Sequence, residues 1–387
     1  MARRCFFQRS RTEPAVGERS WKKPLLQTVR IVAVGVAWLW TSVVLGTGAT
    51  EFSRYEWVES FTLPTGADVF DVLNDGRIVL LVDDQVHVET SSGSRSFTVL
   101  GVLPDAGGMA FPAFVRVSPD GTKIAVGDNA GLVGVFAFPA LTGTWFTASH
   151  FDGEWFDNQK LALSGGTGFT VTLLDTTSAD PQNPMNPTLV TATGFAGGIT
   201  FDSAGNLYTG NGFSGPSDPT QTGEAKYFPV AAWMAVLSGS PALNFVTQGT
   251  LVVDILSAAP LGFDSEGNLF VGGGDFFGGS NETDFAAVVK ASVVTGASGG
   301  GDPADIADVT EVRRFDPDTV DTANFYSLAY NSTRGELYMQ SFGISTMHVF
   351  RAVDVAPATS PVGLGLVMVL MTVSGVAVLR HRRSCKP

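Results

Sequence analysis

The sequence predicts an all-β chain whose central part is a β-propeller, most simply a ring of six four-stranded blades. One hairpin unit recurs along residues 70–340, and its copies are spaced about one blade apart. The chain is also rich in turn formers, with 45 Gly and 20 Pro among 387 residues. Only 16% of the residues are charged and 44% are hydrophobic, which indicates a folded body with a sizeable core and not a disordered one.

The repeated unit is an apolar strand, a polar turn and a second apolar strand. Its copies cover residues 70–82, 115–127, 154–165, 199–211, 261–273 and 328–340. In five of them a glycine stands where a tight hairpin needs a positive φ. These glycines are Gly76, Gly121, Gly205, Gly267 and Gly335. The copy at 154–165 lacks the turn glycine and is the weakest of the set.

The spacing of the units sets the number of blades. Successive turns, taken at positions 75, 120, 158, 204, 266 and 334, are 45, 38, 46, 62 and 68 residues apart. A four-stranded blade of this kind takes about 40–50 residues, so the last two intervals contain insertions. A degenerate seventh unit hidden in 266–334 is the alternative that this spacing leaves open.

The two ends of the repeat region predict how the ring closes. The last unit ends with a strand at 347–352 and has no outer strand after it. The segment 54–64 precedes the first unit and looks like a strand without a partner. We expect 54–64 to complete the last blade, because this closure removes exposed sheet edges.

Two copies of the unit share a sharper motif. Residues 202–208 and 264–270 both have the form Asp-Ser-x-Gly-Asn-Leu-(Tyr/Phe). This motif resembles the hairpin of NHL-type and SMP-30/gluconolactonase-like propellers. For the SMP-30 branch the resemblance implies an axial metal held by an early Glu and by later Asn and Asp residues. Asn211 and Asp275 match that set by position, but no Glu fills the first role.

Loops after the second strand of each blade share one face of a propeller and are the candidate ligand-binding surface. Two long insertions, 212–226 and 272–284, lie on the same face, and loops of this length are often functional. The candidate residues are Asp83, Asp84, Asp128, Asn129, Asn211, Asp275, Phe276 and Gln340. A divalent cation such as Ca²⁺ is the one cofactor that these oxygens suggest, with Asn211 and Asp275 as ligands. The alternative is that these residues cap strand ends and turns.

The N-terminal 49 residues predict an export signal. A basic stretch is followed by an apolar run at 31–46 and by small residues up to Ala49, after which cleavage is expected. An uncleaved signal anchor is the competing interpretation. The mature domain is then predicted to span 50–355.

The C-terminal segment 356–387 predicts a membrane anchor. Eighteen uncharged residues at 362–379 precede the basic cluster Arg380–Arg383, which is expected to stay inside. The segment resembles the PEP-CTERM and IPTL-CTERM sorting signals of Gram-negative bacteria, although the Pro-Glu-Pro core is absent. Both ends predict that 50–355 lies outside, at the cell surface or outer envelope, with the C-terminal signal either retained as an anchor or processed.

Charge is partitioned along the chain. Residues 1–50 and 380–387 hold 12 of the 24 Lys and Arg and 2 of the 37 Asp and Glu, so the body carries a net charge of about −23. Such a body repels nucleic acid, which is not expected as a partner. Cys5 and Cys385 both lie outside the body, which therefore has no disulfide or thiolate site.

These features favour a surface-tethered propeller that acts as a binding or structural module. Its expected partners are the membrane, through the C-terminal anchor, and a surface polysaccharide or another protein. The alternative is a secreted metal-dependent hydrolase of the lactonase kind, although no Ser-His-Asp order, HExxH or Walker loop is present. A propeller that senses an external ligand through a signalling partner is a third reading.

Overall fold

The computed structural model describes most of the predicted body. The described residues are 55–104, 112–128, 131–165, 168–194, 197–211, 225–254, 258–273, 285–305, 312–314, 325–341 and 345–352. The predicted export signal and C-terminal anchor lie outside them. Among these residues, none of the helices has the length and apolar character needed to cross a bilayer.

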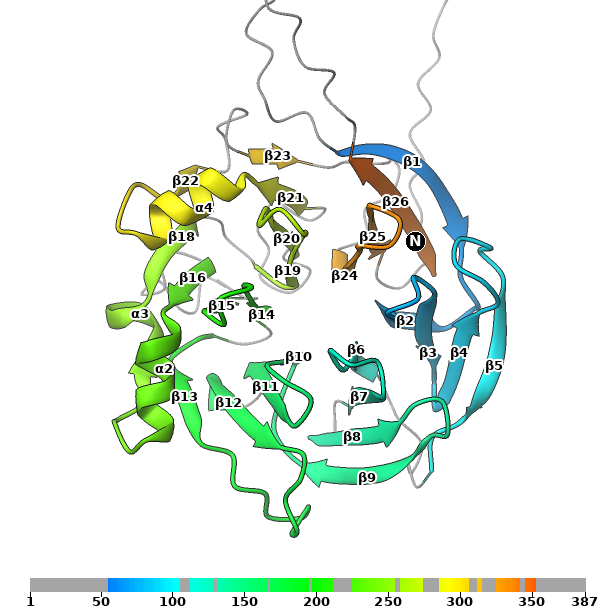
Figure 1. Ribbon diagram of the computed structural model, residues 1–387, viewed down its shortest axis with the longest axis horizontal. Coiled ribbons are helices and arrows are strands. Elements are labelled where there is room, and N and C mark those ends of the chain that lie inside the picture. The colour runs from blue at the N-terminus through cyan, green and yellow to red at the C-terminus, as the bar shows by residue number, and fades with distance from the viewer. Residues whose placement is uncertain are drawn as a thin grey trace, which may run out of the picture. The chain divides into compact units, whose positions relative to one another are not determined.

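The described strands form six blades around a common centre (Figure 1). Blade 1 comprises β2 (Ala67–Val72), β3 (Ile78–Val82), β4 (Gln85–Glu89) and β5 (Phe97–Val102). Blade 2 comprises β6 (Pro112–Val117), β7 (Lys123–Asp128), β8 (Leu132–Ala137) and β9 (Thr142–Thr147). Blade 3 comprises β10 (Asp152–Trp155), β11 (Lys160–Gly165), β12 (Thr170–Asp175), β13 (Thr188–Thr191) and β17 (Leu243–Asn244), the last running parallel to β13.

The second half of the ring follows the same order from the centre outward. Blade 4 comprises β14 (Ile199–Phe201), β15 (Leu207–Gly210), β16 (Ala225–Phe228), β18 (Thr250–Asp254) and β22 (Ala304–Asp305), the last parallel to β18. Blade 5 comprises β19 (Leu261–Phe263), β20 (Leu269–Gly273), β21 (Phe285–Val289) and β23 (Val312–Arg314). Blade 6 comprises β24 (Phe325–Asn331), β25 (Glu336–Ser341), β26 (Thr346–Ala352) and β1 (Tyr55–Thr62). All six recurring units are therefore the first hairpins of their blades, as predicted.

The hairpin turns confirm the predicted role of glycine. The five turn glycines all have positive φ, between 64° at Gly335 and 84° at Gly267. The third hairpin closes without one, because the Asp157 carboxylate accepts hydrogen bonds from the amides of Gln159 and Lys160 at 2.7 and 2.8 Å. A side chain that bonds its own turn thus replaces the missing glycine.

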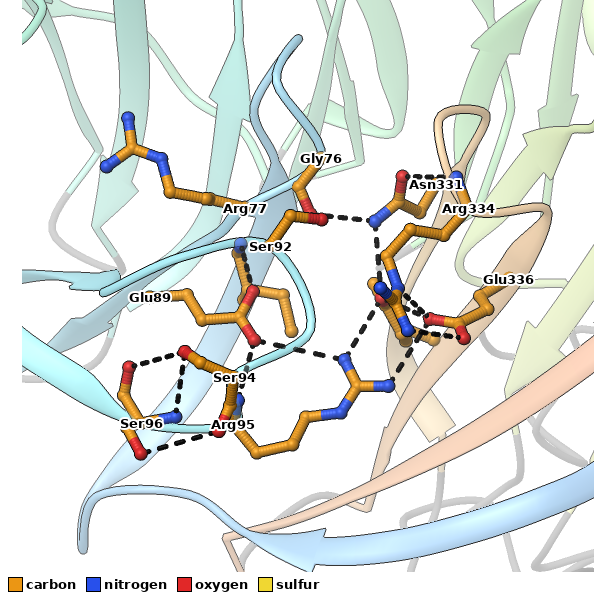
Figure 2. Close-up of polar contacts among 12 residues, drawn as sticks. Gly76, Arg77, Glu89, Ser92, Ser94, Arg95, Ser96, Asn331, Arg334 and Glu336 are labelled. Carbon is orange, nitrogen blue, oxygen red and sulfur yellow. Dashed lines mark hydrogen bonds and ion pairs between the residues drawn. The ribbon is translucent and has the colours of Figure 1, made fainter.

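The predicted closure is confirmed. Strand β1 pairs antiparallel with β26, from Tyr55 opposite Ala352 to Thr62 opposite Thr346 (Figure 1). The outer strand of the last blade therefore comes from the start of the domain. Polar contacts join blades 6 and 1 at the same place, where Asn331 Nδ2 donates to the carbonyl of Gly76 at 2.8 Å (Figure 2).

The two long intervals contain helices that the sequence did not lead us to expect. Helices α2 (Val230–Leu237) and α3 (Phe245–Gln248) lie between β16 and β18, and α4 (Ala291–Ser298) lies between β21 and β23. Apart from strands of blades 5 and 6, the described part of 266–334 thus holds a helix, α4, and a strand, β22, that joins blade 4. The described residues therefore form six blades, and the described part of this interval contains no seventh.

Apolar clusters fill the spaces between neighbouring blades. The described residues form six of them, one at each junction around the ring. Between blades 3 and 4, Trp233 of α2 packs edge-on against Phe156 with ring centroids 4.8 Å apart. Because each blade is held on both sides by buried side chains, the innermost strands keep fixed positions around the axis.

Candidate functional site

The innermost strands of all six blades line a partly open cavity of about 240 Å³ on the axis of the ring. These strands face the centre of the ring in Figure 1. The cavity is lined by Asp71, Arg116, Glu154, Trp155, Thr200, Phe201, Leu261, Gly262, Phe263, Leu328, Ala329 and Tyr330. Most of these residues stand near the end of their strand that enters the first hairpin turn. The cavity therefore lies toward the face that carries those turns.

The lining is polar on one side and apolar on the other. Blades 1 to 3 contribute the charged side chains Asp71, Arg116 and Glu154. Blades 5 and 6 contribute only apolar or aromatic residues and a glycine, among them Phe263 and Leu328. A cavity with one polar and one apolar wall is suited to a ligand that has the same two parts.

Arg116 is the centre of the polar wall. Its side chain is only 7% exposed, and Nη2 donates to Asp152 Oδ1 at 2.7 Å. Nη1 donates to the carbonyl of Val115 at 3.0 Å, and Nε lies 3.7 Å from Glu154 Oε2. The positive charge is thus matched mainly by Asp152, which is buried beside it.

The carboxyl groups around Arg116 also hold the inner strands together. Asp71 Oδ2 accepts a hydrogen bond of 2.6 Å from the amide of Val117, which joins blade 1 to blade 2. Asp152 Oδ1 accepts from the amide of Gly153 at 2.8 Å, whereas its Oδ2 is buried with no hydrogen-bond partner among the described residues. Three carboxyl groups therefore surround one guanidinium.

Burial shifts the proton equilibria of this cluster. It raises the pKa of Glu154 to about 8, with the nearby Arg116 opposing the shift. Burial also raises the pKa values of Asp71 and Asp152, again against the effect of Arg116. Near neutral pH the polar wall therefore includes one carboxyl that can hold or release a proton. Chemically, the cluster can accept hydrogen bonds, attract positive charge and exchange a proton.

The residues predicted as a ligand face lie at the opposite end of the strands. Asp83 is exposed in the turn between β3 and β4, and the carbonyl of Asp84 accepts a hydrogen bond from the amide of Leu103 at 2.9 Å. Buried Asp128 accepts at Oδ1 from the amide of Leu132 at 2.8 Å. The Asp128 contact fits the capping alternative, in which a polar side chain serves its own loop.

The remaining predicted site residues do not form a described site. Asn211 is buried, and its carbonyl accepts a hydrogen bond of 2.8 Å from the amide of Ala258. Gln340 is buried within β25 and donates to the carbonyl of Ala67. Asn129, Asp275 and Phe276 lie outside the described residues, so the proposed metal pair Asn211 and Asp275 stays a prediction. Within the part of the chain that the structure describes, no three His, Cys, Asp or Glu side chains are grouped as a metal site would need.

The axial cluster was missed at the sequence level, although a signal was present. Asp71, Arg116 and Glu154 each stand next to the last residue of an innermost strand. The corresponding strands of blades 5 and 6, around Gly262 and Ala329, carry no charge there. Charges placed at one strand position in three of six repeats mark a shared environment, because equivalent positions of a propeller meet at the axis.

Comparisons with known proteins support the fold. No family model matches the chain, and no curated protein matches it. Among solved structures, the PQQ domain of pyranose dehydrogenase from Coprinopsis cinerea is similar, with a TM-score of 0.50 and 12% identity over 77% of this chain and 97% of that one. A chain of the mitotic checkpoint complex gives a TM-score of 0.47 and 14% identity over 79% of this chain and 94% of that one. At 12% identity the likeness to the dehydrogenase domain concerns the propeller fold alone.

Proposed function

We propose that this chain is an exported binding module, held at the cell surface, that takes a small ligand into the axial cavity of its propeller. The observation that carries the proposal is the cavity of about 240 Å³, walled by all six innermost strands. A concave site in which polar groups converge beside apolar side chains is suited to a small molecule.

The surface location is supported by the sequence and by how the domain ends. The apolar runs at 31–46 and 362–379 lie outside the described residues, and each is flanked by basic residues. Tyr55 and Ala352, near the first and last described residues, are paired on neighbouring strands. Segments before and after the domain therefore attach at one point of blade 6, which suits a domain tethered at a single edge.

The metal-dependent hydrolase alternative has less support. It depends on a set of oxygen ligands at the mouth of the ring, and of the proposed pair only Asn211 is described. The backbone carbonyl of Asn211 is bonded to Ala258, a contact that serves the loop. The other alternative is a purely structural propeller, and a binding experiment must distinguish it from the proposed binding module.

The test is a ligand-observed NMR screen of a small-fragment library against the full chain in detergent micelles. Hits that bind the cavity should be lost when Ala329→Phe fills its apolar wall. The matched control is Ala137→Phe, since Ala137 is exposed at the end of β8 and away from the axis. If Ala329→Phe does not fold, Ala329→Leu fills less volume and serves the same purpose.

Two results would overturn the proposal. One is a folded wild-type chain that binds no fragment, and the other is a set of hits that both Ala329 variants retain. Surface exposure is tested separately, by adding an external protease to intact cells that make the full chain. Protection of the propeller from that protease would contradict the surface part of the proposal.

A further inference from the structure

We infer that the axial cavity selects a small organic cation, with a primary ammonium group at one end and an apolar body at the other. This inference rests on the proposed function and names the class of ligand that the same cavity takes. It follows from the charge balance of the polar wall, the aromatic composition of the facing wall and the acidity of the whole domain.

The polar wall has more acid than base. Arg116 is the one basic side chain that lines the described cavity, and it is already bonded to Asp152 and to the carbonyl of Val115. Asp71 and Glu154 remain as carboxyl groups on the cavity wall. Each oxygen of a carboxylate has more than one acceptor position, so an ammonium group with three donors can bond both groups. An anion placed there would face these two carboxyl groups.

The facing wall suits both the cation and its apolar body. Phe201, Phe263 and Tyr330 line the cavity together with Leu328 and Leu261. The three rings also pack against Phe156, Tyr208 and Phe270 of the neighbouring blades. Aromatic rings attract a cation through their quadrupole, and this attraction grows as water is excluded. The aliphatic side chains favour burial of methylene groups, each of which strengthens binding by about fourfold.

The size of the cavity limits the ligand. Its volume of about 240 Å³ lies just below the range of about 300–1,000 Å³ that is common for ligand pockets. A short alkylammonium or a small aromatic amine fits inside this space, whereas an oligosaccharide or a peptide would extend beyond it. The domain's net charge of about −23 also raises the local concentration of cations over that of neutral or anionic solutes.

Binding of an ammonium group beside Glu154 should have a distinctive signature, which is the release of a proton. Glu154 faces Arg116 of β6, Asp71 of β2 and Asp152 of its own strand, while β14 contributes uncharged Thr200. Its pKa of about 8 means that it holds a proton near neutral pH. A bound ammonium favours the ionised carboxylate, so binding should release a proton and should tighten as the pH rises from 6 to 8.

The experiment is titration calorimetry of the full chain in micelles with butylammonium, butan-1-ol and butyrate, each of which has four carbon atoms. Titrations into protein-free micelles give the blank. We expect butylammonium to bind at least tenfold more tightly than the alcohol or the acid. At pH 7, heats measured in two buffers of different ionisation enthalpy should show proton release.

Two variants test whether the preference for butylammonium and its proton release arise in the cavity. Glu154→Gln should weaken butylammonium at least about tenfold, leave butan-1-ol within twofold and abolish the proton release. The matched control, Glu56→Gln, changes an exposed carboxylate on the outer strand β1 and should leave all three probes unaffected.

The failures of the two proposals are distinguishable. If the fragment screen finds cavity ligands but butyrate or the alcohol binds best, the cation inference is wrong and the binding module stands. The same holds if the screen finds hits and butylammonium does not bind. If the screen itself finds none, both proposals fall.

Discussion

The guanidinium of Arg95 donates to Glu336 Oε2 at 3.3 Å, across the joint between the first and last blades (Figure 2). Arg95 lies between β4 and β5, and Glu336 begins β25. The same guanidinium donates to Glu59 of β1 at 2.9 Å and to the hydroxyl of Tyr338 at 3.1 Å. One side chain of blade 1 thus contacts two strands of blade 6, β25 and the closing strand β1. The closure is held by charge as well as by strand pairing.

Replacing Arg95 tests how much this contact stabilises the closure. Arg95→Met keeps the aliphatic stem and removes the charge. We expect the free energy of unfolding to fall by about 3 kcal/mol, the lower end for breaking a buried pair, because Arg334 and Arg351 still bond Glu336. Urea unfolding of the full chain measures the change.

The matched control for that variant is Arg77→Met. Arg77 pairs with Asp75 at 2.8 Å, but Asp75 is exposed and Arg77 is half-exposed, with side chains 54% and 33% accessible. An exposed pair contributes no more than about 1 kcal/mol. If the two variants lose the same stability, the closure does not depend on the buried position of Glu336.

The stability of the joint should fall in acid. Burial alone would raise the pKa of Glu336, but hydrogen bonds from Arg334, Tyr338 and Arg351 lower it to about 2, against 4.5 for a free Glu. A lowered folded-state pKa stabilises the fold above the unfolded-state value, and this stabilisation is lost as the pH falls from about 4.5 to 2. Urea midpoints between pH 5 and pH 2.5 should therefore drop more steeply in the wild type than in Glu336→Gln. Equal slopes of the urea midpoint against pH in the two proteins would contradict the lowered pKa of Glu336.

The axial cluster should show the opposite dependence. The pKa of Glu154 is raised to about 8, so the folded state keeps a proton that the unfolded chain has lost above pH 4.5. Stability should therefore decrease as the pH rises from about 4.5 to 8. Compared with Glu154→Gln, the wild-type urea midpoint should decline over this range, and a constant difference between the two would refute the shifted pKa.

The features that could be predicted from the sequence are those set by local chemistry and by repetition. A turn glycine such as Gly121 needs only its neighbours to adopt a positive φ, which is 69° here. The pairing of Tyr55 with Ala352 joins residues almost 300 positions apart, yet it follows from counting strands, because one blade lacked its fourth strand and one strand lacked a blade.

The axial site and the helices could not be predicted from local chemistry or from repetition in the sequence. The pKa of Glu154 is raised mainly by burial inside the ring and further by Asp71 of another blade, so the shift exists only once the ring has closed. Helix α2 has no acidic residue in its first turn and no basic residue in its last, and its eight residues are mostly apolar. Its position is set by burial of Trp233 between blades 3 and 4, which is a tertiary effect.

The sharp sequence motif turns out to serve these helices. In blade 4, Asn206 Nδ2 donates to Asp202 Oδ2 at 2.8 Å, while Asn206 Oδ1 accepts from the amide of Val230, the first residue of α2, at 2.9 Å. In blade 5, Asn268 accepts in the same way from the amide of Ala291, the first residue of α4, at 2.9 Å. The two hairpins with the Asp-Ser-x-Gly-Asn motif are the two whose blades carry an inserted helix.

This duplication allows each helix to act as the control for the other. Asn206→Ala removes the acceptor from the first amide of α2 and should cost about 1 kcal/mol, as for loss of an N-terminal cap. Hydrogen exchange at Val230 and in the first turn of α2 should become faster, while α4, held by Asn268, should keep its protection. Asn268→Ala should produce the reverse pattern. Equal loss of protection in both helices from either variant would mean that Asn206 and Asn268 act through the ring as a whole and not as local caps.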